Sequence, residues 1–468
     1  MDNKTALNRR QFLATAAIAG TGALVAGGTT LSSCAGGSAD SKNPAKTPIP
    51  RLKAWRIPNL PDKAANGREL KIGLVGCGGQ GTGDLINAVR SGDGIKVVAL
   101  GDVLKDRLDN TRVQLKKETG QELPDSNCFV GLDAYRKVID MVDVALLVTP
   151  PVYRPVHYEY AVKAGKHVFM EKPICVDVAG YNKLIANAKI ADTKKLCACT
   201  GTQRRHKRSY VEAFKLIADG IIGEITGGAV YWNQSKLWDR KPEKETAEWM
   251  IRDWVNWTWL SGDHIVEQHV HNLDVFNWFS GLKPVAGTAF GARQRRVTGD
   301  QYDMFSVDIE YETGIHVHSM CRQINGCTDN VSEFVQGTLG SWSSRKGENK
   351  QEIKDLKGNV IWAYDDEKAK KEFTVHDPYR LEFVDLFSAV RENKPFNETV
   401  DTANSSLLAV LGRESAYTGQ RLTMDELKSK TMDLLEHPAL KALKDESIDV
   451  RNAKIDFKQF PIPVPGRN

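Results

Sequence analysis

The sequence lacks the marks of a nucleic-acid-binding or zinc-binding protein. Its net charge is only +5 over 468 residues, and its 64 lysines and arginines are scattered and form no stripe that could follow a phosphate backbone. The eight cysteines form no spaced framework, and Cys197 and Cys199 lie too close together, without paired histidines, to indicate a zinc site. We therefore expect no nucleic-acid partner, no metal, and thiols that are buried or idle.

The N-terminal apolar run is too weakly hydrophobic for a permanent membrane span, but it has the organisation of an export signal. Residues 8–13 (NRRQFL) precede an uncharged, Ala- and Gly-rich run over 14–31. The paired arginines resemble a twin-arginine signal, and residues 31–34 (LSSC) resemble a bacterial lipobox. We predict a signal over 1–34 and an exported, periplasmic or envelope-anchored protein whose membrane contact is a lipid on Cys34. An ordinary secretory signal with a chance cysteine is the alternative.

A dinucleotide-binding pattern begins at Lys71. A short apolar strand leads into the segment 76–81 (GCGGQG), an amphipathic helix follows, and a second strand ends at Asp102. The glycines permit a tight turn and let a pyrophosphate approach the N-terminus of the helix. Asp102 lies about twenty residues beyond the last glycine, where a carboxylate meets the ribose 2′-hydroxyl and favours NAD over NADP. Lys105 and Arg107 lie close enough to keep NADP open.

Two further strand ends are predicted to face the cofactor. Residues 142–149 form an apolar strand of the kind found in buried parallel sheets. Doubly wound sheets bind ligands at the carboxyl ends of their strands, where Thr149 and Lys172 both lie. The complete set of predicted cofactor contacts is Gly76, Gly78, Gly79, Gln80, Gly81, Asp102, Thr149, Pro150, His157, Glu171 and Lys172.

In combination, these motifs resemble the family of glucose–fructose oxidoreductase, inositol dehydrogenase and MocA. The residues that carry the resemblance are Gly76–Gly81, Thr149-Pro150-Pro151, Ala164–Val168 with Glu171-Lys172-Pro173, Ile221–Ile225, His271–Asp274 and Gly412–Gly419. It extends from about Leu70 to about Leu427. The resemblance implies an α/β protein with an N-terminal Rossmann domain, built on a doubly wound parallel sheet. It also implies a C-terminal α+β domain with a large open, mostly antiparallel sheet, and a homo-oligomer.

The resulting domain scheme has five parts. We expect the signal over 1–34, a flexible linker over 35–67, the Rossmann domain over 68–200, a substrate and oligomerisation domain over 201–427, and a C-terminal arm over 428–468. The last helices of the second domain are expected to pack back on the Rossmann domain. Strand-like segments in the second half are Thr226–Trp232, Ala286–Arg293, Phe305–Tyr311 and Ile315–Arg322.

Hydride transfer from a carbinol carbon requires a group that takes the hydroxyl proton and a donor that stabilises the alkoxide. The resemblance places part of this work on Lys172. The family pattern of an Asp, three residues and a His matches Glu267 and His271, with glutamate in place of aspartate. The longer side chain leaves open whether Glu267 contacts the substrate or only orients His271. On one helix these two share a face and His269 faces elsewhere; a metal at these three residues is a lesser alternative.

An aromatic wall is predicted on the substrate side. Six of the ten tryptophans lie between Trp232 and Trp259, and sugar rings stack on indoles. We expect at most two of the six to contact substrate. The predicted substrate-binding residues are Arg205, His206, Tyr210, Trp232, Tyr302 and Asp303.

The favoured function is an NAD(P)-dependent oxidoreductase that acts on a secondary hydroxyl of a sugar or glycoside, with C3 as a candidate position. Little free NAD(P) exists outside the cytoplasm, so an exported enzyme is expected to hold its cofactor tightly and to reset it with a second substrate. The alternative is an NAD-dependent glycosidase or lyase that works by transient oxidation and elimination. A sugar-binding protein with a vestigial cofactor site is a third reading, against which Lys172 and His271 argue.

Overall fold

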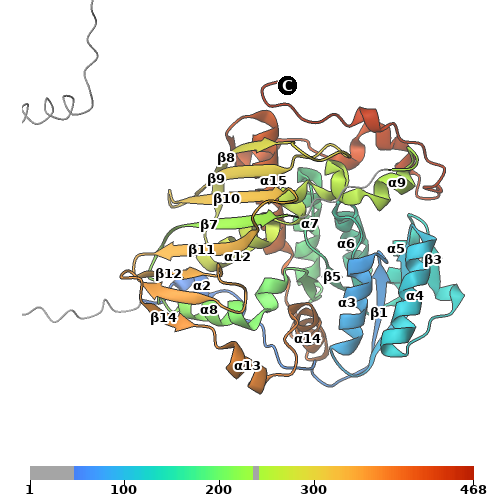
Figure 1. Cartoon of the computed structure of the whole chain (residues 1–468). Helices are drawn as coiled ribbons and strands as arrows, with labels where there is room; N and C mark the ends of the chain where they lie inside the picture. Colours follow the sequence, from blue (N-terminus) through green and yellow to red (C-terminus); the bar gives the residue numbers. More distant parts are fainter. Residues whose placement is uncertain (1–46, 236–241, 468) are drawn as a thin grey trace, which may run out of the picture. The chain divides into compact units, whose positions relative to one another are not determined.

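The computed structural model describes residues 47–235 and 242–467, and these contain two sheets that share one continuous hydrophobic core (Figure 1). The predicted signal and Cys34 lie outside the described residues. Core side chains come from both sheets, for example Val168 from the first and Val317 from the second. The predicted two-domain architecture is confirmed.

The first sheet consists of six parallel strands in the order β3-β2-β1-β4-β5-β6. The order reverses between β1 and β4, which creates a crevice at the carboxyl ends of these two strands, where doubly wound sheets bind ligands. The strands are β1 (Leu70–Val75), β2 (Ile95–Asp102), β3 (Cys128–Val130), β4 (Val144–Leu147), β5 (His167–Met170) and β6 (Ala198–Thr200). The helices between them are α3 (Gly79–Arg90), α4 (Lys105–Thr119), α5 (Ala134–Met141), α6 (Arg154–Lys163) and α7 (Val178–Thr193).

The second sheet has nine strands in the order β14-β13-β12-β11-β7-β10-β9-β8-β15. The pair β7 and β10 is parallel, and the other neighbouring pairs are antiparallel. The strands are β7 (Ile225–Gln234), β8 (Pro284–Ala292), β9 (Met304–Tyr311), β10 (His316–Gln323), β11 (Asn330–Gly337), β12 (Gly340–Ser343), β13 (Glu352–Asp355), β14 (Val360–Ala363) and β15 (Leu422–Thr423). All four predicted strand segments of this half are therefore confirmed.

Helices cover one face of the second sheet, because its strands alternate between buried and exposed side chains. In β10, Val317, Ser319 and Cys321 are buried and the residues between them are exposed. The helices of this half are α8 (Arg208–Ala218), α9 (Ala247–Arg252), α10 (Thr258–Ser261), α11 (His264–Glu267), α12 (Val270–Ser280), α13 (Asp366–Glu372), α14 (Pro378–Arg391), α15 (Thr399–Thr418) and α16 (Met424–Ser429).

A late helix, α14, packs on the Rossmann domain. Phe383 and Phe387 of α14 join the apolar cluster that contains Ile72 of β1 and Phe169 of β5. The rings of Phe169 and Phe383 are 4.5 Å apart between centroids. Because α14 lies in the chain between β14 and β15 of the second sheet, this contact links the two halves.

The segment before β1 is packed against the core, so the expectation of a flexible linker is wrong from Ile49 onward. A short helix, α2 (Pro50–Lys53), buries Leu52, and Ile49 donates its backbone N–H to the carbonyl of Ala218. Leu60 is buried as well. The Pro- and Lys-rich composition suggested a tether, but these spaced apolar residues hold the segment in place.

The C-terminal arm also packs on the protein, in short 3-10 turns beside α9 (Figure 1). Within the described ranges, no helix is long and apolar enough to cross a membrane. The seven described cysteines are all free thiols, and five of them are buried.

Replacing Phe383 with Ala should lower the free energy of unfolding by about 3–5 kcal/mol, because the change leaves a cavity between α14 and the first sheet. Urea denaturation followed by circular dichroism measures this loss. The matched control is Val113→Ala on α4, which is 63% exposed and should change stability by no more than about 0.5 kcal/mol. Equal losses in both variants would contradict the packing described.

Candidate active site

A cavity of about 810 Å³ lies at the carboxyl ends of β1, β2, β4 and β5, and residues of the second half close its other side. All eleven predicted cofactor contacts, including Lys172, line it, and so do Glu267, His271 and Trp232. Volumes of this order suit small-molecule and cofactor sites. Sequence segments up to about three hundred residues apart therefore meet in one site.

The glycine loop is shaped to receive a phosphate group. Gly76 has a φ of +101°, and a Cβ at Gly81 would lie 2.0 Å from the carbonyl oxygen of Gly76, so both positions require glycine. By contrast, a Cβ at Gly79 would meet nothing within 4 Å. This open space lies at the N-terminus of α3, where free N–H groups favour an anion. The residues present thus fit the pyrophosphate of a dinucleotide.

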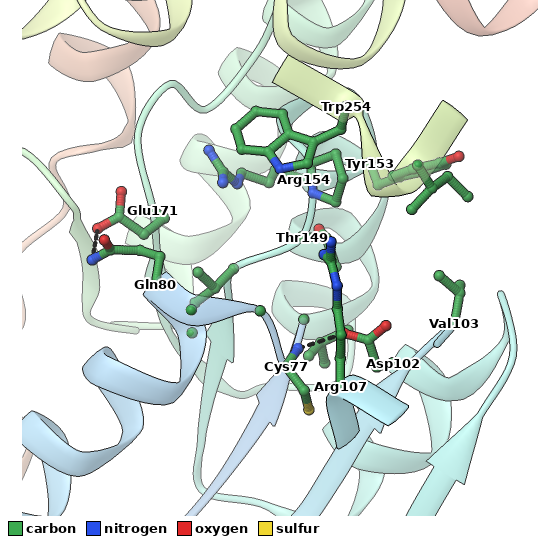
Figure 2. Close-up of a pocket in the computed structure, with 18 of the residues that line it drawn as sticks. Cys77, Gln80, Asp102, Val103, Arg107, Thr149, Tyr153, Arg154, Glu171 and Trp254 are labelled. Atoms are coloured by element: carbon green, nitrogen blue, oxygen red, sulfur yellow. Dashed lines mark hydrogen bonds between the residues drawn. The ribbon is translucent and has the colours of Figure 1, made fainter. Parts of the chain in front are cut away.

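Backbone hydrogen bonds hold Asp102 in place, and one of them comes from the glycine loop. Its carboxylate accepts hydrogen bonds from the backbone N–H groups of Cys77, at 2.6 Å, and Leu104, at 2.7 Å. Burial raises the pKa of this carboxyl group, and the two hydrogen bonds oppose the rise. Arg107 extends from α4 beside Asp102 toward Thr149 (Figure 2). Lys105 instead pairs with Asp109 at 2.6 Å, outside the cavity lining.

Thr149 is held by His157, whose Nδ1 lies 3.3 Å from the threonine hydroxyl oxygen. The His157 ring stacks on Tyr135, with 4.3 Å between centroids, and faces Tyr153 on its other side. Burial lowers the pKa of His157 to about 3, and nearby arginines add to this effect. His157 is therefore neutral at physiological pH and orients Thr149 without adding charge to the cofactor site.

Lys172 reaches from the end of β5 into a break between two helices. Its Nζ donates to the carbonyl oxygen of Glu267 at 2.6 Å and lies 3.6 Å from the carboxylate of the same residue. Since α11 ends at Glu267 and α12 begins at Val270, the continuous helix expected over 267–271 is interrupted. The interruption turns Gln268 into the cavity, and its amide oxygen lies 3.4 Å from Nζ.

His271 lines the cavity with its ring stacked on Trp232, at 5.5 Å between centroids and an interplanar angle of 21°. Burial lowers the pKa of His271 well below its usual value, and the charges of Lys172 and Arg204 lower it further. The ring is therefore neutral and able to accept a proton. His269 points away, as predicted, and bonds the Ser319 hydroxyl at 2.7 Å.

Five of the six predicted substrate-binding residues do not line this cavity. Arg205 forms two hydrogen bonds of 2.8 Å with Asp274, and His206 bonds Asp385 at 3.1 Å. The Tyr210 hydroxyl donates to Glu333 at 2.9 Å. These groups follow β6 in sequence, but they are buried, and a buried charged or polar group requires a partner in the protein.

Tyr302 and Asp303 are likewise structural. The Tyr302 hydroxyl donates to the carbonyl of Pro463 in the C-terminal arm at 2.9 Å. The Asp303 carboxylate accepts backbone N–H groups of the turn that precedes it in the chain, including that of Arg296 at 3.2 Å. Trp232 is the predicted substrate residue that the structure places in the cavity.

Several lining residues were missed by sequence analysis. They are Tyr153, Arg154, Gln234, Trp254, Gln268, Gln323 and Tyr379. Of the six clustered tryptophans, Trp232 and Trp254 line the cavity, while Trp238 lies outside the described residues. The tryptophan cluster was the signal that could have identified Trp254; the glutamines and Tyr379 carry no local motif.

One cluster of metal-ligating residue types occurs elsewhere in the described ranges, formed by Cys199, His206 and Glu398. Its members are already engaged, because His206 bonds Asp385, and Glu398 accepts the backbone N–H of Thr200 at 2.9 Å. Asp385 is also paired with Arg56, whose positive charge disfavours a bound cation. We therefore assign no metal to this cluster.

Family models identify the protein class. The model for the GFO/IDH/MocA oxidoreductase family, NAD-binding Rossmann fold, matches residues 70–198, and the GFO/IDH/MocA C-terminal domain matches residues 210–343. Together they cover more than half of the sequence. The chain belongs to this family. It is therefore an oxidoreductase that binds NAD, and the resemblance found in the sequence is confirmed.

Individual relatives are distant. A scyllo-inositol 2-dehydrogenase (NAD(+)) of Bacillus subtilis is 23% identical over 78% of this chain and 98% of its own length. A glycosyl hydrolase family 109 protein of Shewanella pealeana is 24% identical over 52% of this chain, and the match covers 50% of that protein. The structure of scyllo-inositol dehydrogenase from Lactobacillus casei with NAD(H) and scyllo-inositol has a TM-score of 0.57 and 20% identity. That match covers 76% of this chain and 99% of the other.

The buried His269 should make the folded protein less stable as the pH falls. Burial lowers its pKa to about 3, whereas an unfolded histidine titrates near 6.5. As the pH falls from 7 to 5, the unfolded chain gains a proton that the folded chain does not, which costs about 2 kcal/mol at pH 5. Urea titrations at several pH values across this range should show that the free energy of unfolding depends less steeply on pH in His269→Gln, by the equivalent of about one proton. The control is His318→Gln, which removes an exposed histidine of β10; equal slope changes would contradict the burial argument.

Proposed function

We propose that the protein is a dehydrogenase that oxidises a secondary hydroxyl of a sugar, polyol or glycoside. The observation that carries this proposal is the meeting of Lys172 and His271 in the cavity that also contains the glycine loop. Inositol dehydrogenases among the relatives support a polyhydroxylated substrate. Oxidation at C3 of the sugar remains part of the proposal, although no described residue selects this carbon.

Lys172 and His271 have different roles in the proposed reaction. The neutral ring of His271, which lines the same cavity as Lys172, accepts the hydroxyl proton of the substrate. Lys172 donates a hydrogen bond to the same substrate oxygen and stabilises the charge that develops on it. Glu267 acts on Lys172, whose Nζ it meets with both its carbonyl and its carboxylate. Bound NAD supplies the hydride acceptor.

The stacked face of Trp232 fixes the orientation of His271 and presents an apolar surface beside it. Gln234 accepts the indole N–H of Trp232 at 3.1 Å, which leaves the amide nitrogen of Gln234 for a substrate hydroxyl. An apolar ring face with flanking polar groups suits a sugar ring.

A glycosidase that works by transient oxidation and elimination is the second candidate. The family 109 glycosyl hydrolase among the relatives favours it, while the retained Glu171-Lys172-Pro173 sequence favours the dehydrogenase. A panel of polyols and aryl glycosides separates the two functions. A persistent reduced-nicotinamide band near ~340 nm supports the dehydrogenase. A transient band with release of free aglycone would establish the glycosidase instead.

Replacing Lys172 with Met, or His271 with Gln, should lower the rate of nicotinamide reduction by about 10²–10⁴-fold, since each change removes a proton-transfer or charge-stabilising group. Stopped-flow absorbance with saturating cofactor measures this step. The matched control is Lys166→Met, which removes a half-buried lysine just before β5 and outside the cavity lining. Unchanged rates in both active-site variants would contradict the proposed chemistry.

We also propose that the protein is exported, lipid-anchored through Cys34, and homo-oligomeric, with its cofactor held tightly. The paired arginines and the lipobox-like residues 31–34 support export and anchoring. The exposed sheet face, where Phe290 is 78% exposed, supports association of subunits.

Cys34→Ala should abolish incorporation of a labelled fatty acid in bacterial cells and release the protein from the membrane fraction, because the thiol is the lipidation site. Metabolic labelling with an alkyne fatty acid followed by fractionation checks this. The control is Cys327→Ala, which removes another cysteine that is not buried. Label retained in Cys34→Ala would show that the anchor is wrong.

A further inference from the structure

One wall of the cavity comes from a segment far from the glycine loop in sequence. The helix α9 and the turn after it contribute Ile251 and Trp254, and both line the cavity. Trp254 lies across the cavity from Cys77 and Asp102 (Figure 2). This segment therefore covers the space that fits the dinucleotide.

Arg252 ties α9 to the Rossmann domain. Its guanidinium donates to the two carboxylate oxygens of Asp106, at 2.8 and 3.0 Å, and Asp106 lies at the start of α4 and lines the cavity. The same guanidinium bonds Glu248, one turn earlier in α9, at 2.9 and 3.0 Å. The paired bonds fix the direction of the side chain as well as its distance.

The C-terminal arm holds α9 from its other side. The backbone N–H groups of Ala247 and Glu248 donate to the carbonyls of Ala453 and Val450, at 2.8 and 3.1 Å. Apolar side chains of the arm join the same cluster as those of α9 and α10; they include Leu440, Val450, Ile455 and Phe460 from the arm and Met250, Ile251 and Trp259 from the helices.

Glu446 fastens the arm to the first domain. Its carboxylate accepts hydrogen bonds from Arg136 at 2.9–3.1 Å and from the Tyr135 hydroxyl at 3.1 Å. Tyr135 lines the cavity and stacks on His157, which holds Thr149. Both ties, from Arg252 and from Glu446, therefore end on residues at the rim of the dinucleotide site.

We propose that α9 and the C-terminal arm form a clasp over the dinucleotide, and that Arg252 and Glu446 are positioning residues that set how fast the dinucleotide dissociates. The inference rests on the proposed function, because it concerns the cofactor of the same site. Opening this wall separates Arg252 from Asp106 and Glu446 from Arg136. The arm lies beyond the two segments that the family models match, whereas α9 lies within the second of them.

The test measures the dissociation of reduced NAD from the whole protein by its fluorescence after dilution into a competitor, with no sugar present. Arg252→Gln and Glu446→Gln should each raise the dissociation rate about two- to fivefold, the range expected when one solvent-accessible ion pair is lost. The hydride-transfer rate at saturating cofactor should change less than the dissociation rate. Glu436→Gln is the matched control, because its ion pair with Lys444 lies within the arm.

Each outcome decides a separate point. Dissociation rates equal to that of the wild type in both variants would overturn the clasp and leave the proposed function intact. A rise in Arg252→Gln alone would overturn the part assigned to the arm. Failure of the wild-type protein to bind reduced NAD would overturn the clasp together with the cofactor assignment on which it rests.

Discussion

The break between α11 and α12 leaves the carbonyl oxygen of Glu267 without a backbone donor among the described residues, and Lys172 of the first sheet donates to it. A helix end in a buried place must satisfy its carbonyls, and a lysine ammonium group can do so. The same contact holds the lysine in the wall of the cavity. A continuous helix would bond this carbonyl internally and leave Lys172 without its anchor, so the geometry of the site depends on the break.

Buried ion pairs give the second half the rigidity that such a contact requires. Glu333 of β11 accepts Arg204 at 2.7 Å and Asn272 of α12 at 2.7 Å, and it also receives the Tyr210 hydroxyl. Asn272 is the residue after His271, so this carboxylate orients the helix that carries the catalytic histidine. Removing either partner would leave a buried charge unpaired, which is far more costly than losing an exposed pair.

The sequence was most informative where geometry is local. The glycine loop, Asp102 and the strand ends follow from steric and hydrogen-bonding rules that act over a few residues, and the structure brings all of them to the cavity. Arg205 was misplaced because proximity in sequence to a strand end does not reveal a partner such as Asp274, which lies 69 residues away. The clasp could not be predicted from the sequence for the same reason, since α9 and the arm meet only in the folded chain.

The charge balance around the cavity follows from burial. Burial raises the pKa of Asp84 and Glu382 well above the usual carboxyl value, and it lowers the pKa of Arg154 to about 10. Ionising these carboxyls together with Glu171 would place several negative charges beside the glycine loop. Burial thus shifts these carboxyls toward their neutral forms, which lessens the repulsion that an anionic pyrophosphate would meet from this side. The electrostatics of the glycine loop therefore suit an anionic cofactor.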